Sequence, residues 1–159
     1  MRIKTGGRRL GALALMVGSL GMALGAAAPA GAGVVATQEP QVLFVAPVVT
    51  VRGDQAQIIG VYRCFGGEPI HLWVSAKQGG PDPTAEDSGA TSTSWYDTNI
   101  AGAPPVICDG RYHVATVPVG RYPNKAQLTS GQAWVQFCLV DENFGFLATQ
   151  SKWARVIGP

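Results

Sequence analysis

The sequence predicts an all-β domain, built as an antiparallel two-sheet β-sandwich of about seven strands and preceded by a cleaved leader. Three observations predict it. Apolar and polar residues alternate with period two over most of the chain after residue 40. The 21 Gly and 11 Pro residues favour short elements joined by turns. No stretch shows the 3.6-residue apolar spacing of a convincing amphipathic helix.

A secretory signal peptide is expected over residues 1–32. Met1–Arg9 is basic, and Leu10–Ala27 is an uncharged stretch of Leu, Ala, Met, Val and Gly. Small residues follow it, so we expect cleavage after Ala32, with Ala30 as the alternative site. A retained membrane anchor is the competing interpretation. The Gly and Ala content of the stretch, and positive charge on one side only, argue against it.

The mature domain is expected at residues 41–159, after a loose N-terminal segment at residues 33–40. In chain order the predicted strands are Val42–Val45 and Val48–Arg52 (one strand broken at Pro47), Ala56–Cys64, Ile70–Ala76, Ser94–Thr98, Arg111–Val117, Ala133–Leu139 and Lys152–Ile157. Gln78–Thr93 reads as a long polar loop. Loops of that length usually have a functional explanation or are disordered.

The charge balance argues against nucleic acid as a partner. The formal net charge of +2 comes from the leader, where Met1–Arg9 holds four of the 12 Lys and Arg residues. Its removal leaves 8 basic and 10 acidic side chains, a net charge of −2. Nucleic-acid binding rests on neutralising phosphates with basic side chains. We therefore expect no nucleic-acid partner.

Three cysteines in an exported protein predict one disulfide and one spare thiol, and three pairings can be drawn. Strand alternation discriminates among them. Cys64 lies on the apolar face of its strand, whereas Cys138 lies on the face opposite Phe137 and so points away from the core. Cys64–Cys108 is therefore the favoured pair.

Three runs carry a resemblance to a known family: Ile59–Cys64 (IGVYRC), Cys108–His113 (CDGRYH) and Ser130–Val135 (SGQAWV). They resemble an uncharacterised family, a domain of unknown function, of small exported proteins from high-GC Gram-positive bacteria. The resemblance covers most of the mature chain. It implies an immunoglobulin-like β-sandwich with a disulfide at Cys64 and Cys108, and it brings no activity, cofactor or catalytic residue. Cys138 matches no cysteine of that family.

No catalytic pattern outweighs its structural interpretation. There is no G-x-S-x-G motif, and the histidines, His71 and His113, each lie in an ordinary alternating strand. Cys138 has no local cation or histidine that would activate it as a nucleophile. The competing interpretations are a half-buried free thiol beside Trp134, which we prefer, and an intermolecular disulfide.

Metal binding is not expected either. The histidines and cysteines lack the spacing of a zinc site. Asp82, Glu86 and Asp87 lie in the long loop but lack the calcium-loop pattern, so a solvated acidic loop is preferred. The sequence predicts no enzyme activity, no cofactor and no metal.

The aromatic residues offer the best candidate for a functional site. Alternation places Trp73 and Trp134 on the outward faces of their strands, and Trp95 and Tyr96 follow the long loop. Together they form a candidate surface for a protein, glycan, peptide or small ligand, unless loops fold over them. We expect a secreted, monomeric, non-catalytic protein with a binding or structural role outside the cell. The alternatives are a small-molecule carrier and, less favoured, an enzyme inhibitor presenting residues 78–93 or a hydrolase.

Overall fold

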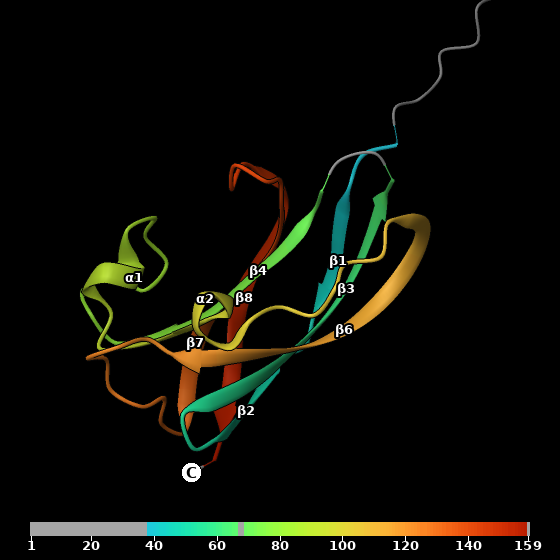
Figure 1. Ribbon diagram of the computed structural model, residues 1–159. Helices are drawn as coiled ribbons and strands as arrows, with labels where there is room; N and C mark the ends of the chain where they lie inside the picture. The colour runs from blue at the N-terminus through green and yellow to red at the C-terminus, as the bar shows by residue number, and fades with distance from the viewer. Residues whose placement is uncertain (1–37, 67–68, 159) are drawn as a thin grey trace, which may run out of the picture. The chain divides into compact units, whose positions relative to one another are not determined.

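Eight β-strands make up most of the domain (Figure 1), and they include every predicted strand, although the strand predicted at Lys152–Ile157 begins at Phe146 and the one predicted at Arg111–Val117 extends from Asp109 to Arg121. The computed structural model describes residues 38–66 and 69–158. The strands are β1 (Gln41–Val45), β2 (Val48–Arg52), β3 (Gln55–Phe65), β4 (His71–Gln78), β5 (Ser94–Asp97), β6 (Asp109–Arg121), β7 (Gly131–Val140) and β8 (Phe146–Ile157). Two four-residue helices, α1 (Ser88–Thr91) and α2 (Thr98–Ala101), complete the described part. The predicted signal peptide and its cleavage sites lie outside the described residues.

The strands form one sheet that closes on itself as a seven-strand barrel. Around the barrel the order is β3, β2, β8, β7, β4, β5 and β6, and β6 pairs again with β3. The eighth strand, β1, pairs with β3 next to this ring, with Val45 opposite Gly60. Neighbouring strands are antiparallel except β2 and β8, which run parallel with Val48 opposite Arg155. Closure leaves little free edge for pairing with another chain.

The all-β prediction is confirmed, but the structure has continuous hydrogen bonding where the sequence predicted two separate sheets. Two pairings close the ring. β3 pairs with β6 along nearly its whole length, with Ile58 opposite Val117. The short strand β5 joins β4 to β6, with Tyr96 opposite Arg121. Alternation assigns a residue to a face and says nothing about which strand lies beside it, so closure could not be predicted from it.

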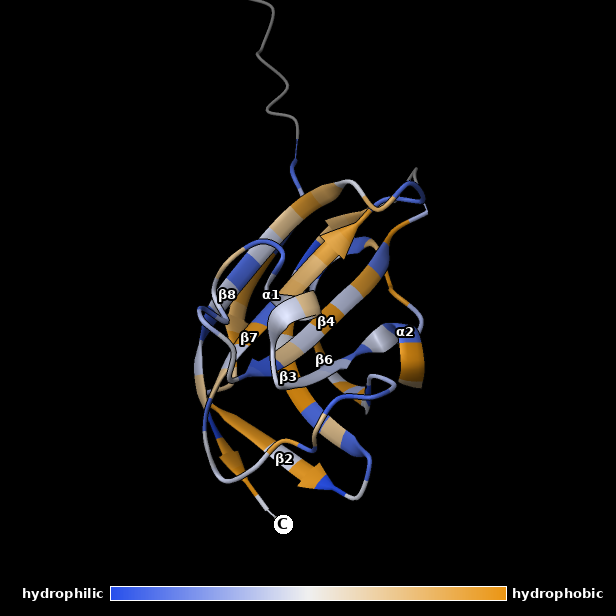
Figure 2. Ribbon diagram, turned by 90° about the vertical axis from the view of Figure 1, so that its left-hand side faces the viewer, coloured by the Kyte–Doolittle hydropathy of each residue, from blue (hydrophilic) through white to orange (hydrophobic). Residues whose placement is uncertain are grey.

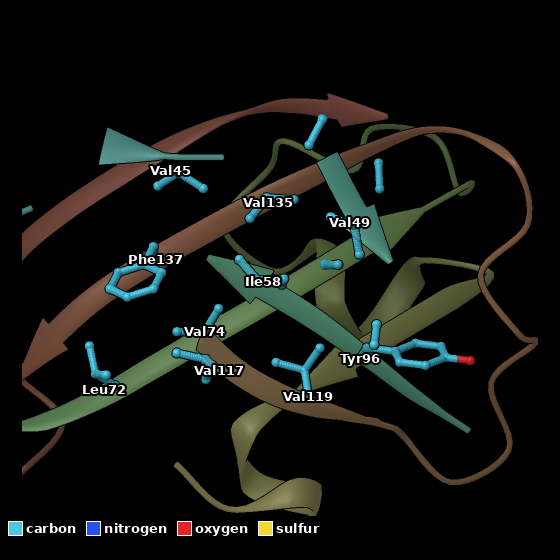
Figure 3. Close-up of a cluster of buried hydrophobic side chains, with 14 of the residues drawn as sticks. Val45, Val49, Ile58, Leu72, Val74, Tyr96, Val117, Val119, Val135 and Phe137 are labelled. Carbon is cyan, nitrogen blue, oxygen red and sulfur yellow. The ribbon is translucent and has the colours of Figure 1, made fainter. Parts of the chain in front are cut away.

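The inward-facing side chains form one apolar core, and Figure 3 shows them meeting from several strands of the barrel. In β3 the predicted inner residues Ile58, Tyr62 and Cys64 are buried, and in β7 Val135 and Phe137 are buried. The alternation is visible in Figure 2 as changes of hydropathy along the strands. The predicted face assignments of these two strands are therefore confirmed.

The predicted disulfide is present. Cys64, near the end of β3, is bonded to Cys108, which directly precedes β6. The bond therefore ties together two strands that are already paired. Cys138 is the free cysteine and is buried.

Candidate functional site

The outer face of four adjacent strands, β5, β4, β7 and β8, carries most of the aromatic residues singled out above. Residues directly opposite one another on β4, β7 and β8 form three rows: Trp73, Cys138 and Thr149; Ser75, Gln136 and Ser151; and Lys77, Trp134 and Trp153. These residues alternate along their strands with core residues, so their side chains lie outside the barrel.

All four tryptophans of the sequence lie on this outer face, which we call the tryptophan face. Trp95 extends the third row onto β5, because it lies opposite Lys77. Trp134 contacts Trp153 edge to face, with ring centroids 5.5 Å apart. Trp153 is 47% exposed and is the most accessible of the four. The face thus combines a broad apolar surface with polar side chains between the rings.

Residues 79–93, which we call the α1 segment, fold against part of the tryptophan face (Figure 2). Gly89 packs so closely on Trp95 that a Cβ added to it would lie 3.1 Å from the ring atom Cε2. The Lys125 Nζ donates hydrogen bonds to the carbonyl oxygens of Ala90 (2.6 Å) and Ser92 (2.9 Å). The sequence predicted a long polar loop at Gln78–Thr93 and left open whether loops fold over the tryptophans. The contacts of Gly89 with Trp95 and the hydrogen bonds from Lys125 hold the α1 segment against the rest of the domain.

A cleft of about 290 Å³ lies between the α1 segment and the tryptophan face. It is lined by Trp73, Lys77, Glu86, Asp87, Gly89, Ala90 and Trp95. Trp73 supplies an apolar wall. Glu86 and Asp87 are exposed and contribute carboxylates from the α1 segment. The cleft is therefore apolar on one side and carries charges of both signs.

Lys77 is the most unusual residue of the cleft. It is only 2% exposed, yet none of the described residues forms a hydrogen bond or an ion pair with its Nζ. Burial lowers the pKa of Lys77 below its ordinary value of 10.5, and the nearby Cys138 thiol partly opposes this shift. Because Lys77 lines the cleft and its Nζ is not one of the fully buried side-chain atoms, the ammonium ends a buried aliphatic stem at the surface of the cleft.

Within the described residues, buried polar atoms without partners occur in the tryptophan face and in the α1 segment. Five buried side-chain atoms of the tryptophan face and the α1 segment have no hydrogen-bond partner among the described residues: Ser75 Oγ, Ser88 Oγ, Ser92 Oγ, Trp95 Nε1 and Trp134 Nε1. Buried polar atoms in proteins are normally hydrogen-bonded. Of these residues, Trp95 lines the cleft, and the other four lie elsewhere on the face and in the segment.

The structure brings Trp73, Trp95 and Trp134 together on one face, as the sequence suggested. Tyr96 is not part of this face, because its ring is fully buried in the core (Figure 3). The reason is the alternation itself: neighbouring residues of a strand point to opposite faces, so Tyr96 must point inward where Trp95 points outward. Naming Tyr96 as a contact residue was therefore wrong.

Cys138 points away from the core, as predicted, but it is fully buried where a half-buried thiol was expected. Burial raises the pKa of this thiol above its ordinary value of 9.0, against smaller opposing effects of a Thr149 hydrogen bond and of Lys77. A thiol that stays protonated is a poor nucleophile.

Two residues of the site escaped the sequence analysis. Lys77 lies one residue beyond the predicted end of its strand at Ala76, and the alternation of Trp73 and Ser75, continued by one step, places it outward with them. Trp153 lay inside a predicted strand, and its outward position follows from the burial of Ala154 beside it. The alternation could have identified both.

The remaining candidate residues lie elsewhere. His71 is exposed at the start of β4, and the His113 Nε2 lies 2.8 Å from Asp109 Oδ1. This contact holds the pKa of Asp109 below its usual value. Within residues 38–66 and 69–158, no group of three or more His, Cys, Asp or Glu side chains is arranged to hold a metal ion. No helix in the same ranges has the length and hydropathy of a membrane span.

The tryptophan face and its cleft have to be interpreted from their own chemistry. No model of a known protein family matches the chain, and no curated protein is significantly similar to it in sequence.

Proposed function

We propose that the chain is an exported, monomeric, non-catalytic binding protein and that the tryptophan face is its binding surface. One observation carries the proposal: all four tryptophans project from the same outer face. Trp is a costly residue to expose, and indole rings provide large, rigid contact area with one polar group. Tryptophans needed only for packing would point into the core, where the structure holds none of them.

Export rests on two supports. The first 32 residues have the pattern of a signal peptide. The domain also contains a disulfide, a bond that persists in oxidising compartments.

The proposal includes a relationship of this domain to immunoglobulin-like domains, which the sequence resemblance implies. A largely antiparallel, all-β domain with the implied disulfide supports it. The closed hydrogen bonding of the barrel departs from a strict two-sheet sandwich.

A small-molecule carrier is the second candidate, and the cleft beside Lys77 favours it. A concave site with an apolar wall and a few convergent polar groups is the usual form of a small-ligand site. A flat surface for a large partner would not need a buried charge below it.

The test starts from the chain secreted into culture medium and recovered without reductant. Its native mass is compared before and after denaturation in wild type, in Trp73→Ala and in Phe44→Ala. Phe44 is a matched control, because it is an exposed aromatic residue on β1, outside the tryptophan face. We expect an excess mass that denaturation removes in wild type and Phe44→Ala and that is absent in Trp73→Ala.

If the recovered protein is bare, its melting temperature is measured with N-acetylglucosamine oligomers, aromatic amino acids and short peptides. An increase that Trp73→Ala abolishes supports binding. No excess mass and no increase would overturn the binding function in favour of a structural role. A chain that stays in the cells with residues 1–32 attached would overturn export.

A further inference from the structure

We infer that the cleft between the tryptophan face and the α1 segment binds a small zwitterionic ligand with a flat apolar body, and that Lys77 holds its carboxylate. An aromatic amino acid has this chemistry. The inference rests on the proposed function and deepens it by naming the ligand class.

Lys77 supplies the first argument. Its side chain lines the cleft and is 2% exposed, and its Nζ, which keeps some contact with solvent, forms no ion pair with the residues that the structure describes. Transfer of a charged group out of water costs on the order of several kcal/mol, unless an opposite charge or hydrogen bonds replace the water. A ligand carboxylate would supply both, because charge-assisted N–H···O bonds are the strongest that a lysine forms.

Trp95 supplies a second wall of the same space. Its ring lies against Gly89, which also lines the cleft. The indole ring is held by stacking on Tyr122, with centroids 4.1 Å apart and the planes 8° from parallel. A ring held in this way offers the flat body of a ligand a rigid apolar wall.

Trp73 determines the kind of body that the ligand carries. It forms the apolar wall of the cleft, and its outer contact is an edge-to-face arrangement with Phe146 at 6.0 Å. Aromatic rings favour edge-to-face or offset stacking with a flat partner. The cleft volume of about 290 Å³ is near the lower end of small-ligand sites, which begin at about 300 Å³, so the ligand is small.

Glu86 and Asp87 account for the second charge of the ligand. Both line the cleft from the α1 segment and are exposed, and neither is paired with Lys77 or with another described cation. A ligand with only a negative charge would meet repulsion there, whereas an amino group would be attracted. The arrangement of a buried cation and accessible carboxylates therefore favours a zwitterion over a simple acid.

The experiment measures binding to the folded, disulfide-bonded protein at pH 7 by tryptophan fluorescence and calorimetry. The probes are L-phenylalanine, 3-phenylpropanoate, which lacks the amino group, and 2-phenylethylamine, which lacks the carboxylate. We expect L-phenylalanine to bind most tightly, 3-phenylpropanoate more weakly and 2-phenylethylamine not at all. Inorganic phosphate is added as a further anion and should not compete.

Variants then assign the charges. Lys77→Met should weaken L-phenylalanine and 3-phenylpropanoate binding by about tenfold or more, the loss expected for a hydrogen bond to a charged group. Glu86→Gln combined with Asp87→Asn should reduce L-phenylalanine to the affinity of 3-phenylpropanoate. Lys152→Met is the matched control, because Lys152 lies beside Phe44 and not in the cleft. This variant should bind L-phenylalanine as tightly as wild type does.

Equal binding by Lys77→Met and wild type would overturn the inference, as would competition by phosphate. If Lys77→Met does not fold, the three probes are compared on the wild-type protein. Binding of 2-phenylethylamine as tight as that of L-phenylalanine would contradict a role of the ligand carboxylate. If no probe binds while the secreted protein carries a Trp73-dependent mass, the inference fails and the proposed function stands. If no probe binds and the secreted protein carries no Trp73-dependent mass, the proposed binding function fails as well.

Discussion

Gly60 on β3 lies directly against the aromatic ring of Phe137 on β7, although these strands are not neighbours in the sheet. A Cβ added to Gly60 would overlap the ring, which is fully buried. The contact therefore crosses the interior of the barrel, and the missing side chain of Gly60 provides the space that the ring fills.

Gly60→Ala should lower the free energy of unfolding by about 1–3 kcal/mol, because one extra methyl group overpacks a full core. Urea denaturation measures the change. The double variant Gly60→Ala/Phe137→Leu should be less destabilised than the sum of its single changes, since the smaller side chain makes room for the methyl group. Unchanged stability of Gly60→Ala would mean that the ring does not occupy this position.

Lys77→Met should stabilise the protein without ligand at pH 7, because burial disfavours the charged form of Lys77 and Met replaces it with an apolar chain of similar length. The gain should shrink as pH rises toward 10.5. Folding lowers the pKa of Lys77 below that value, so between the two pKa values the unfolded chain binds more protons and the wild type gains stability with pH. Glu86 and Asp87 also face Lys77 and are ionised throughout this pH range in both proteins, whereas the pKa of the Cys138 thiol should rise further in Lys77→Met, because in the wild type Lys77 partly opposes the rise that burial causes.

Unfolding in urea at a series of pH values from 7 to about 10.5 gives the difference between the two proteins. Lys152→Met is the control, and its stability should stay within about 0.5 kcal/mol of wild type. A destabilised Lys77→Met protein would show that the ammonium has a stabilising partner.

Lys125→Met should loosen the α1 segment, because the Lys125 Nζ holds the carbonyl oxygens of Ala90 and Ser92. Limited proteolysis of the native protein followed by mass spectrometry locates and times the cuts. We expect cleavage within residues 79–93 about tenfold faster than in wild type, since local opening becomes easier by the energy of the lost bonds. Equal rates would show that the contacts of Gly89 with Trp95 suffice to hold the segment.

Thiol titration should distinguish the three cysteines without any mutation. The native protein should react with no equivalent of an aromatic disulfide reagent, because Cys138 is fully buried and its thiol pKa is raised. Unfolding without reductant should expose one thiol, since Cys64 and Cys108 are bonded to each other. Rapid reaction of the native protein would contradict the burial of Cys138.

The alternation of apolar and polar residues predicted which way most side chains point. It separated Cys64 from Cys138, and it placed Trp73 and Trp134 on the outside. This works because the side-chain period of a strand is fixed at two by the backbone. The same rule excludes Tyr96 from the surface, so that error came from treating two adjacent aromatics as one feature.

The closure of the barrel and the burial of Lys77 could not be predicted in this way. Closure depends on the pairing of β3 with β6, whose paired residues are far apart in the sequence: Gln57 and Pro118 are 61 positions apart, and Tyr62 and His113 are 51 positions apart. The burial of Lys77 depends on the α1 segment, whose composition is that of an open loop. Both are tertiary effects between segments that carry no local signal for each other.

The parallel pairing of β2 with β8 has a consequence for how the molecule is made. β2 is near the beginning of the domain and β8 is its last strand, with Thr50 opposite Ile157. A chain that emerges N-terminus first, from a ribosome or through an export channel, therefore has to present β8 before the ring can be joined. Until then the edges of β2 and β7 stay available to wrong partners.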